Sequence, residues 1–259
     1  MTMTPPAPPP LPEPENPFTL HPSQPPKRSR LPVIVLTALL VVTVVALGIV
    51  TAQLLGMRVE PVNQSSNVQP VQVTDVAVAI GSPSAATTVD LYVDYMCPYC
   101  GTFDRMNGPD IAAKVADGEI LFRLHPMSFL DQASGGTMYS TRAANAVVTV
   151  ARFAPEKFLA FHMELFELQP MEGTPGLTDA QLVDAATSVG VPANVSARFS
   201  ALAEQAWIAS ATQADFAVVT GTPTVMINKM KVNVNLYQPG AIIQALAQAA
   251  ANPSPSPSG

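Results

Sequence analysis

The hydrophobic positions of this 259-residue chain form one long uncharged run. After this run, short segments with the two-residue period of strands are interspersed with segments that have the three- to four-residue period of helices. The uncharged run covers residues 31–56. At a rise of 1.5 Å per residue, a helix of about 25 residues crosses a hydrocarbon core of ~30 Å. A cleaved signal peptide is the alternative, but about 30 residues precede the run and no A-x-A-like site follows it. We therefore predict a transmembrane signal-anchor helix over residues 31–56.

The segments around this run are polar. Residues 1–30 carry many prolines and no apolar periodicity, which predicts a disordered tail. Lys27, Arg28 and Arg30 precede the run directly, so the positive-inside rule places this tail in the cytoplasm and the rest of the chain on the other side of a cell membrane. Residues 57–75 are expected to be a linker and residues 251–259 a second disordered tail.

Residues 76–250 alternate between strand and helix signals, which is typical of an α/β fold. A helix should begin at the cysteines, be interrupted or bent near Gly108 and Pro109, and end before Gly118. Helical spacing dominates residues 137–216, with a capping box from Thr178 to Gln181, and we expect a helical insert over about 130–216. The predicted strands are residues 76–80, 88–95, 119–125, 224–227 and 230–235, and the last predicted helix is 239–250.

Charge and cysteine content exclude several classes of function. The net charge is −6, so the chain has no general attraction for nucleic acid phosphates. The two cysteines are only three positions apart, so they cannot staple distant segments together. The three histidines, His21, His125 and His162, are scattered, and we expect no metal site and no cofactor. His125 and His162 are expected to be packing or surface residues, and a structural disulfide remains an alternative for the cysteines.

The Cys97-Pro98-Tyr99-Cys100 segment follows a predicted strand and opens a predicted helix. The free N–H groups and positive dipole end of the helix should stabilise the thiolate of Cys97 and lower its pKa. A stabilised thiolate favours the reduced form and makes the disulfide a stronger oxidant. Pro98 and Tyr99 are expected to tune the potential, and Cys100 should resolve the mixed disulfide formed on Cys97.

Two motifs in the same order carry a family resemblance: DYMCPYC, from Asp94 to Cys100, and GTPTVMIN, from Gly221 to Asn228. Together with the long helical insert, they resemble the DsbA-like branch of the thioredoxin superfamily over about 71–250. The resemblance implies a thioredoxin-like domain in which Pro223 is cis and lies beside the cysteines, while Thr222 offers its backbone to substrate.

One position departs from the family pattern. Relatives often hold a buried acidic residue six positions before the first cysteine, where it assists proton transfer from the deeper thiol, and here that position is Leu91. Asp90 should point to the opposite face of the strand, and Asp94 can serve the turn into the helix. Water and Asp90 remain the candidates for the proton partner of Cys100.

The resemblance implies a protein-disulfide oxidoreductase outside the cytoplasm, in the first place an oxidase that introduces disulfides into exported proteins. It further implies a membrane partner of the DsbB or vitamin-K-epoxide-reductase (VKOR) type that re-oxidises the pair. A reductase or isomerase of the same fold is one alternative, because the direction depends on the reduction potential. A non-catalytic binding module with a structural disulfide is another. We expect a monomer.

Overall fold

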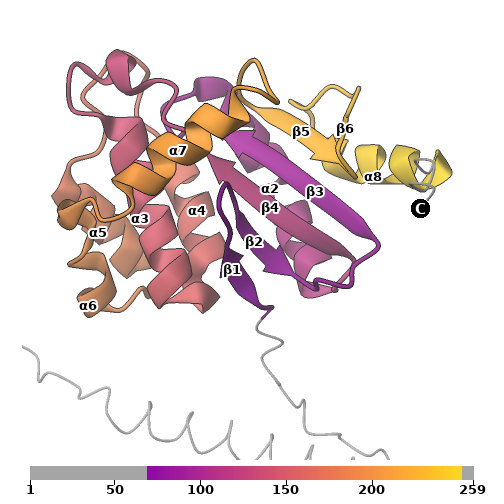
Figure 1. Cartoon of the computed structure of the whole chain (residues 1–259), viewed down its shortest axis with the longest axis horizontal. Helices are drawn as coiled ribbons and strands as arrows, with labels where there is room; N and C mark the ends of the chain where they lie inside the picture. The colour runs from indigo at the N-terminus through magenta and orange to yellow at the C-terminus, as the bar shows by residue number, and fades with distance from the viewer. Residues whose placement is uncertain (1–68, 253–259) are drawn as a thin grey trace, which may run out of the picture. The chain divides into compact units, whose positions relative to one another are not determined.

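The computed structural model describes residues 69–252, and these form a six-stranded sheet with helices on both faces (Figure 1). The strand order is β1-β2-β4-β3-β5-β6. Strands β3 and β4 are parallel, and every other neighbouring pair is antiparallel. The strands are β1 Val71–Val73, β2 Val78–Gly81, β3 Thr87–Val93, β4 Ile120–Pro126, β5 Thr224–Ile227 and β6 Met230–Lys231.

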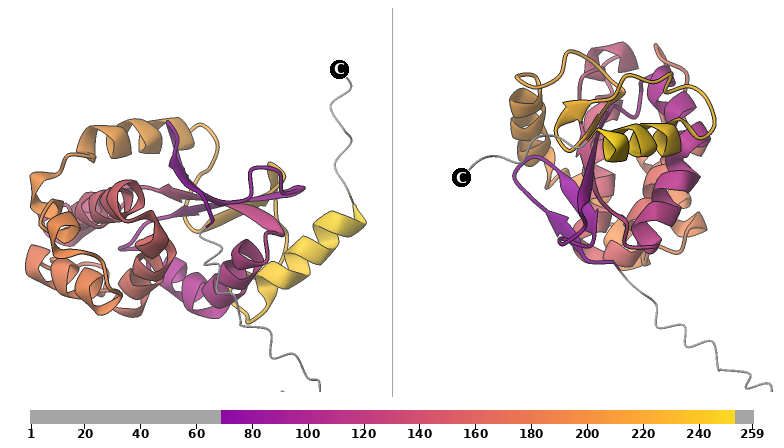
Figure 2. Two further views of the ribbon diagram at one scale, coloured as in Figure 1. Left: turned by 90° about the horizontal axis from the view of Figure 1, so that it is seen from below. Right: turned by 90° about the vertical axis from the view of Figure 1, so that its right-hand side faces the viewer.

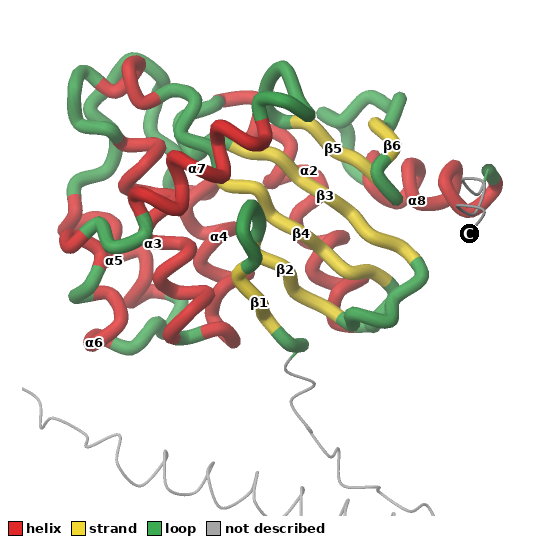
Figure 3. Tube along the Cα trace, viewed as in Figure 1, coloured by secondary structure: helices red, strands yellow, loops and turns green. Residues whose placement is uncertain are grey.

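Helices α2 and α8 pack on one face of the sheet and α7 covers part of the other (Figure 2). Between β4 and β5 all the regular elements are helical, and most of them gather beyond one end of the sheet (Figure 3). The helices are α2 Pro98–Ala116, α3 Tyr139–Phe153, α4 Phe158–Glu167, α5 Asp179–Ser188, α6 Ala193–Ser196, α7 Gln205–Asp215 and α8 Ala241–Ala251. Three 3-10 helices complete the described chain: η1 Asp131–Ser134, η2 Pro155–Lys157 and η3 Phe199–Ala201.

Local sequence explains where the main elements begin and end. Strand β3 is rich in β-branched residues, and its second half is buried. Helix α2 has Pro98 in its first turn, where a missing N–H costs nothing, and Gly118 with φ +70° follows its end. The predicted capping box at the start of α5 is confirmed: the Thr178 side chain accepts from the Gln181 N–H, and the Gln181 side chain accepts from the Thr178 N–H.

Three expectations about local structure need correction. The predicted linker 57–75 is wrong at its end, because Val71–Val73 forms strand β1 and pairs with β2. The helix after the cysteines is not interrupted at Pro109, which lies inside a single helix α2. The last predicted strand is shorter than expected, since β6 contains only Met230–Lys231.

The predicted tail 1–30 and membrane span 31–56 lie outside the described residues, as does most of the predicted tail 251–259. Within residues 69–252 no helix is both long and apolar enough to cross a bilayer.

Candidate functional site

The two cysteines lie where β3 leads into α2. Cys97 has extended backbone angles and occupies the N-cap position of α2, and the N–H of Cys100 donates to the carbonyl of Cys97 over 3.0 Å. Both residues are free thiols. Cys97 is 6% exposed and Cys100 is fully buried, so the first sulfur is the one that an external reactant can reach.

The loop before β5 lies against Cys97. The peptide bond between Thr222 and Pro223 is cis, as the family resemblance implied. When it is protonated, the thiol of Cys97 donates to the carbonyl oxygen of Thr222, which lies 3.5 Å from Sγ. Two segments that are 125 residues apart in sequence therefore meet at one sulfur atom.

The two thiols have opposite tendencies to ionise. A hydrogen bond from the Cys100 thiol, aided by the backbone N–H groups of Cys100 and Tyr99, lowers the pKa of Cys97 to about 6 against the effect of burial. Burial, followed by the hydrogen bond to Cys97, raises the pKa of Cys100 well above its usual value. At neutral pH the reduced pair is therefore a thiolate at Cys97 beside a neutral thiol at Cys100.

The two residues between the cysteines are on the surface. Pro98 is exposed, and the side chain of Tyr99 is 62% exposed. The ring of Tyr99 lies 5.7 Å from the ring of Tyr237, which belongs to the segment between β6 and α8. Both sequence-predicted tuning residues thus border the accessible sulfur of Cys97.

Position 91, which departs from the acidic residue of the family pattern, belongs to the hydrophobic core. Leu91 is fully buried in the hydrophobic core. Asp90 takes part in a buried charge cluster instead: its carboxylate binds Arg123 Nε at 2.8 Å and His125 Nε2 at 3.0 Å. His125 Nδ1 lies 3.2 Å from Asp215 at the end of α7. The expectation that His125 is a packing or surface residue missed this cluster, and Asp90 is already engaged within it.

Asp94 holds together the segments around the cysteines. Its fully buried carboxylate accepts hydrogen bonds from the Met96 N–H at 2.8 Å, the Leu130 N–H at 2.8 Å and the Ser140 hydroxyl at 2.6 Å. Burial raises the pKa of Asp94 to about 6. Asp94 therefore fixes the turn into α2, as expected, and also ties that turn to the insert.

A second set of buried polar side chains lies among α2, α4 and the β3–α2 connection, and the sequence did not predict it. His162 of α4 bonds to the Tyr95 hydroxyl over 2.8 Å through Nδ1 and to Asp104 over 3.1 Å through Nε2. Tyr95 and Asp104 are close in sequence, but His162 lies 67 residues after Tyr95. The one available signal was the position of Asp104, four residues after Cys100 and hence on the same face of the helix.

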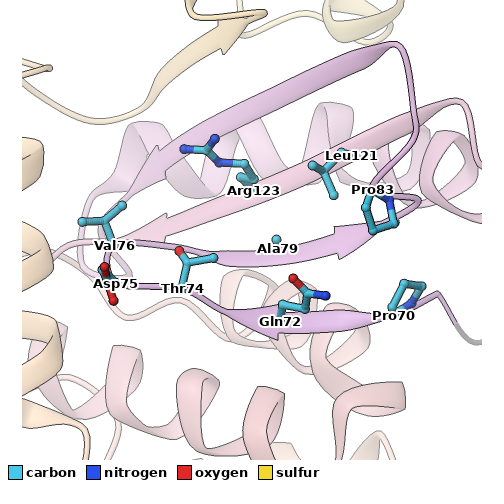
Figure 4. A pocket seen from close by; sticks show the side chains of 10 residues that line it. Pro70, Gln72, Thr74, Asp75, Val76, Ala79, Pro83, Leu121 and Arg123 are labelled. Carbon is cyan, nitrogen blue, oxygen red and sulfur yellow. The ribbon is translucent and has the colours of Figure 1, made fainter.

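Residues 69–252 contain no cluster of metal ligands, but they form a cavity away from the cysteines. No group of three His, Cys, Asp or Glu side chains in this range is arranged to hold a metal ion. A cavity of about 390 Å³ lies over β1, β2 and β4, and its lining includes Gln72, Ala79 and Arg123 (Figure 4). Neither cysteine nor the Thr222–Pro223 loop lines this cavity.

The fold and the paired cysteines agree with the comparisons with known proteins. The family model described as thioredoxin matches residues 73–245. The chain belongs to the thioredoxin family. Within it, the chain is a DsbA-like member of the superfamily and falls in the class of protein-disulfide oxidoreductases, which includes its solved structural relatives.

Three of these solved structures come from actinobacterial proteins. Reduced DsbA from Mycobacterium tuberculosis is 28% identical with a TM-score of 0.56, covering 68% of this chain and 93% of that one. Reduced DsbG from the same organism is 27% identical with a TM-score of 0.56, covering 73% and 92%. MdbA from Actinomyces oris, a thiol-disulfide oxidoreductase, is 29% identical with a TM-score of 0.58, covering 67% and 88%.

One curated relative is a protein kinase. The serine/threonine-protein kinase PknE of Mycobacterium tuberculosis is 37% identical over 166 residues, which are 60% of this chain but only 29% of the kinase. This chain therefore spans less than a third of that protein.

Proposed function

We propose that this protein is an oxidase that introduces disulfides into exported proteins through the Cys97–Cys100 pair. In this proposal residues 31–56 anchor the chain in the cell membrane with the catalytic domain outside the cytoplasm. A membrane partner of the DsbB or VKOR type re-oxidises the pair, and the protein works as a monomer. The observation that carries the proposal is the placement of Cys97 at the N-cap of α2, against the loop with the cis peptide bond Thr222–Pro223, with the fully buried Cys100 one turn behind it. This placement lowers the pKa of Cys97 to about 6.

The lowered pKa bears on the direction of electron flow. A thiolate that is stabilised in the folded protein stabilises the reduced state, and a stable reduced state makes the disulfide a stronger oxidant. The same stabilisation makes Cys97 a good leaving group when the mixed disulfide is released to substrate. Both effects favour oxidation of substrate thiols over reduction of substrate disulfides.

The proposed reaction has two exchange steps. A substrate thiolate attacks Sγ of Cys97, the Cys97–Cys100 bond breaks, and Cys100 leaves with the electron pair and takes up a proton. A second substrate thiolate then attacks the substrate sulfur of the mixed disulfide, and Cys97 leaves as a thiolate. Two electrons pass from the substrate dithiol to the cysteine pair, and the substrate gains one disulfide.

The surroundings of Cys97 suit an unfolded polypeptide as substrate. The carbonyl of Thr222, next to the cis-proline Pro223, lies 3.5 Å from Sγ of Cys97. Because Cys97 has no hydrogen to donate in the disulfide, this carbonyl can accept a hydrogen bond from the backbone of a peptide. Exposed apolar side chains lie on the segments next to the site. They are Tyr99, Phe129, Phe216, Val218 and Tyr237. Exposed patches of this kind mark interaction surfaces.

The test uses variants of the full chain expressed in cells, followed by acid quenching. The Cys100→Ala variant should accumulate mixed disulfides with exported proteins on non-reducing gels, because the resolving thiol is gone. The matched Cys97→Ser, Cys100→Ala double variant should show none. A binding module with a structural disulfide would trap nothing in either variant.

The direction of transfer is read from the wild-type chain in the same cells. An oxidase that is re-oxidised by a membrane partner should be found mainly as the disulfide after acid quenching and thiol alkylation. A reductase would be found mainly as the dithiol, and that result would contradict the proposal.

A further inference from the structure

The core beneath the cysteines contains a hydrogen-bonded row of three polar side chains, Tyr95, His162 and Asp104. They come from the β3–α2 connection, α4 and α2. The Tyr95 hydroxyl lies 2.8 Å from Nδ1 of His162, and Nε2 of His162 lies 3.1 Å from Oδ1 of Asp104. Tyr95 is fully buried, and the other two are at most 3% exposed. We call this row the buried relay.

The geometry assigns the direction of each hydrogen bond. An ionised Asp104 only accepts, so Nε2 of His162 carries the hydrogen that it receives. In a neutral imidazole the other nitrogen, Nδ1, is then an acceptor, and the Tyr95 hydroxyl donates to it. The same arrangement, in which a carboxylate orients a histidine that accepts from a hydroxyl, prepares the histidine to take a proton in serine hydrolases.

The relay lies close to the buried thiol of Cys100. Asp104 follows Cys100 by four residues in α2, so the two side chains lie one turn apart on the same helix face. Tyr95 and Cys100 belong to the same buried cluster. Burial raises the pKa of Tyr95 well above its usual value, and the charges that Asp104, Tyr139, Cys100 and Asp94 carry when they are ionised raise it further. The hydroxyl of Tyr95 therefore stays protonated at neutral pH.

Simple packing does not require these polar groups. The rings of Phe122, Phe158 and Phe166 surround His162 at centroid distances of 5.3–6.5 Å. A fourth apolar ring would fill this place without the desolvation of three polar side chains.

We propose that Tyr95 and His162 carry the proton of Cys100 and that Asp104 positions His162, a role that rests on the proposed thiol–disulfide exchange. When Cys100 attacks a mixed disulfide on Cys97, its proton passes to the Tyr95 oxygen while the Tyr95 proton passes to Nδ1 of His162. The products are a Cys100–Cys97 disulfide, a released substrate thiolate and an imidazolium paired with Asp104. In the oxidising direction the imidazolium returns the proton to the Cys100 thiolate by the reverse path.

Two other titratable groups face Tyr95. Asp94 is held by the Met96, Leu130 and Ser140 donors, none of which is a base that could pass a proton onward. Tyr139 of α3 is fully buried, and its hydroxyl has no hydrogen-bond partner within the described structure. Tyr139 therefore offers a matched control: a second buried tyrosine whose hydroxyl is outside the relay.

The test is a stopped-flow experiment on the reduced full-length chain with a fluorescent peptide disulfide. The first phase, attack by Cys97, accelerates with peptide concentration. The second phase, attack by Cys100, does not. General acid–base assistance is worth about 100-fold or more, so Tyr95→Phe should slow the second phase at pH 7 by about this factor and leave the first unchanged. As the pH rises toward the raised pKa of Cys100, solvent hydroxide ionises this thiol directly and the difference should shrink.

The controls separate the possible failures. Tyr139→Phe should leave both phases unchanged, and Asp104→Asn should slow the second phase in the same way as Tyr95→Phe. A Tyr95→Phe protein that is folded by circular dichroism and resolves at the wild-type rate at every pH would overturn the relay. If the wild-type chain shows no first phase, or if Cys97→Ser retains it, the proposed function itself fails.

Discussion

The hydrogen bond between the two thiols makes a testable contribution to the ionisation of Cys97. The Cys100 thiol is the leading cause of the low Cys97 pKa, ahead of the helix-start N–H groups. A hydrogen bond to a charged group is worth about 1.5–3 kcal/mol, and one pKa unit corresponds to about 1.4 kcal/mol. Removing this donor should therefore raise the Cys97 pKa by about one to two units, from about 6 to about 7–8.

Two substitutions at Cys100 isolate this contribution. Cys100→Ala removes the donor, whereas Cys100→Ser keeps a hydroxyl donor at nearly the same place. Because the chain has only two cysteines, each variant contains a single thiol, and its thiolate absorbance at 240 nm reports Cys97 alone. The midpoint in the alanine variant should lie at least one pH unit above that in the serine variant.

Equal midpoints in these two variants would refute the reasoning. The thiolate would then be stabilised by the N-terminus of α2 and the Thr222 loop, with no measurable share from the neighbouring side chain. The thermal midpoints of both variants, measured at the same pH values, show whether either substitution disturbs the fold.

Three further predictions concern stability. Although burial opposes it, hydrogen bonds to Asp215 and Asp90 raise the pKa of His125. The stabilisation from this contact is therefore complete below about pH 6.5 and is lost as the pH rises through the raised pKa of His125. In urea unfolding, the free energy of unfolding of His125→Gln should lack this dependence on pH. The pKa of Asp94 is raised to about 6, so the free energy of unfolding of the wild-type chain should fall by about 2 kcal/mol between pH 4 and 7 because of this group, and an equal fall in Asp94→Asn would contradict the prediction. The ring of Phe161 is fully buried and stacks on the ring of Phe199, so Phe161→Ala should lower the free energy of unfolding by about 3–5 kcal/mol at an unchanged m-value. A loss under about 1 kcal/mol would show that the core collapses around the cavity.

Sequence reasoning succeeded where the signal is local. The helix start at the cysteines follows from Pro98 and from the strand before it, and the capping box at Thr178 needs only four residues. The order of the longer strands and helices follows from periodicity, because these elements are long enough to show their own repeat. Strand β1 escaped this reasoning, since its three residues have too little periodicity and are ordered by pairing with β2.

The buried polar groups could not be predicted in the same way. His125 meets Asp90 and Asp215 across 35 and 90 residues of sequence, and only the folded sheet and α7 bring them together. His162 meets Tyr95 across 67 residues. A single histidine in a sequence carries no sign of its partners, so packing was the reasonable expectation for both.

The contact between Cys97 and Thr222 was reached by a different route. No local pattern connects residues 97 and 222, and the expectation came from the resemblance to DsbA-like proteins. The family resemblance thus predicted this long-range contact, which periodicity and spacing could not predict.

The most direct test of the account is the reduction potential of the full-length chain, measured by equilibration with glutathione buffers at pH 7. A thiol with a pKa of about 6 in place of about 8.5 stabilises the reduced form by about 1.4 kcal/mol at pH 7, which corresponds to about 30 mV. This contribution moves the potential in the oxidising direction, so the account predicts a value above that of thioredoxin, toward the value of about −120 mV for DsbA. A potential near about −270 mV, as in thioredoxin, would contradict the proposed oxidase.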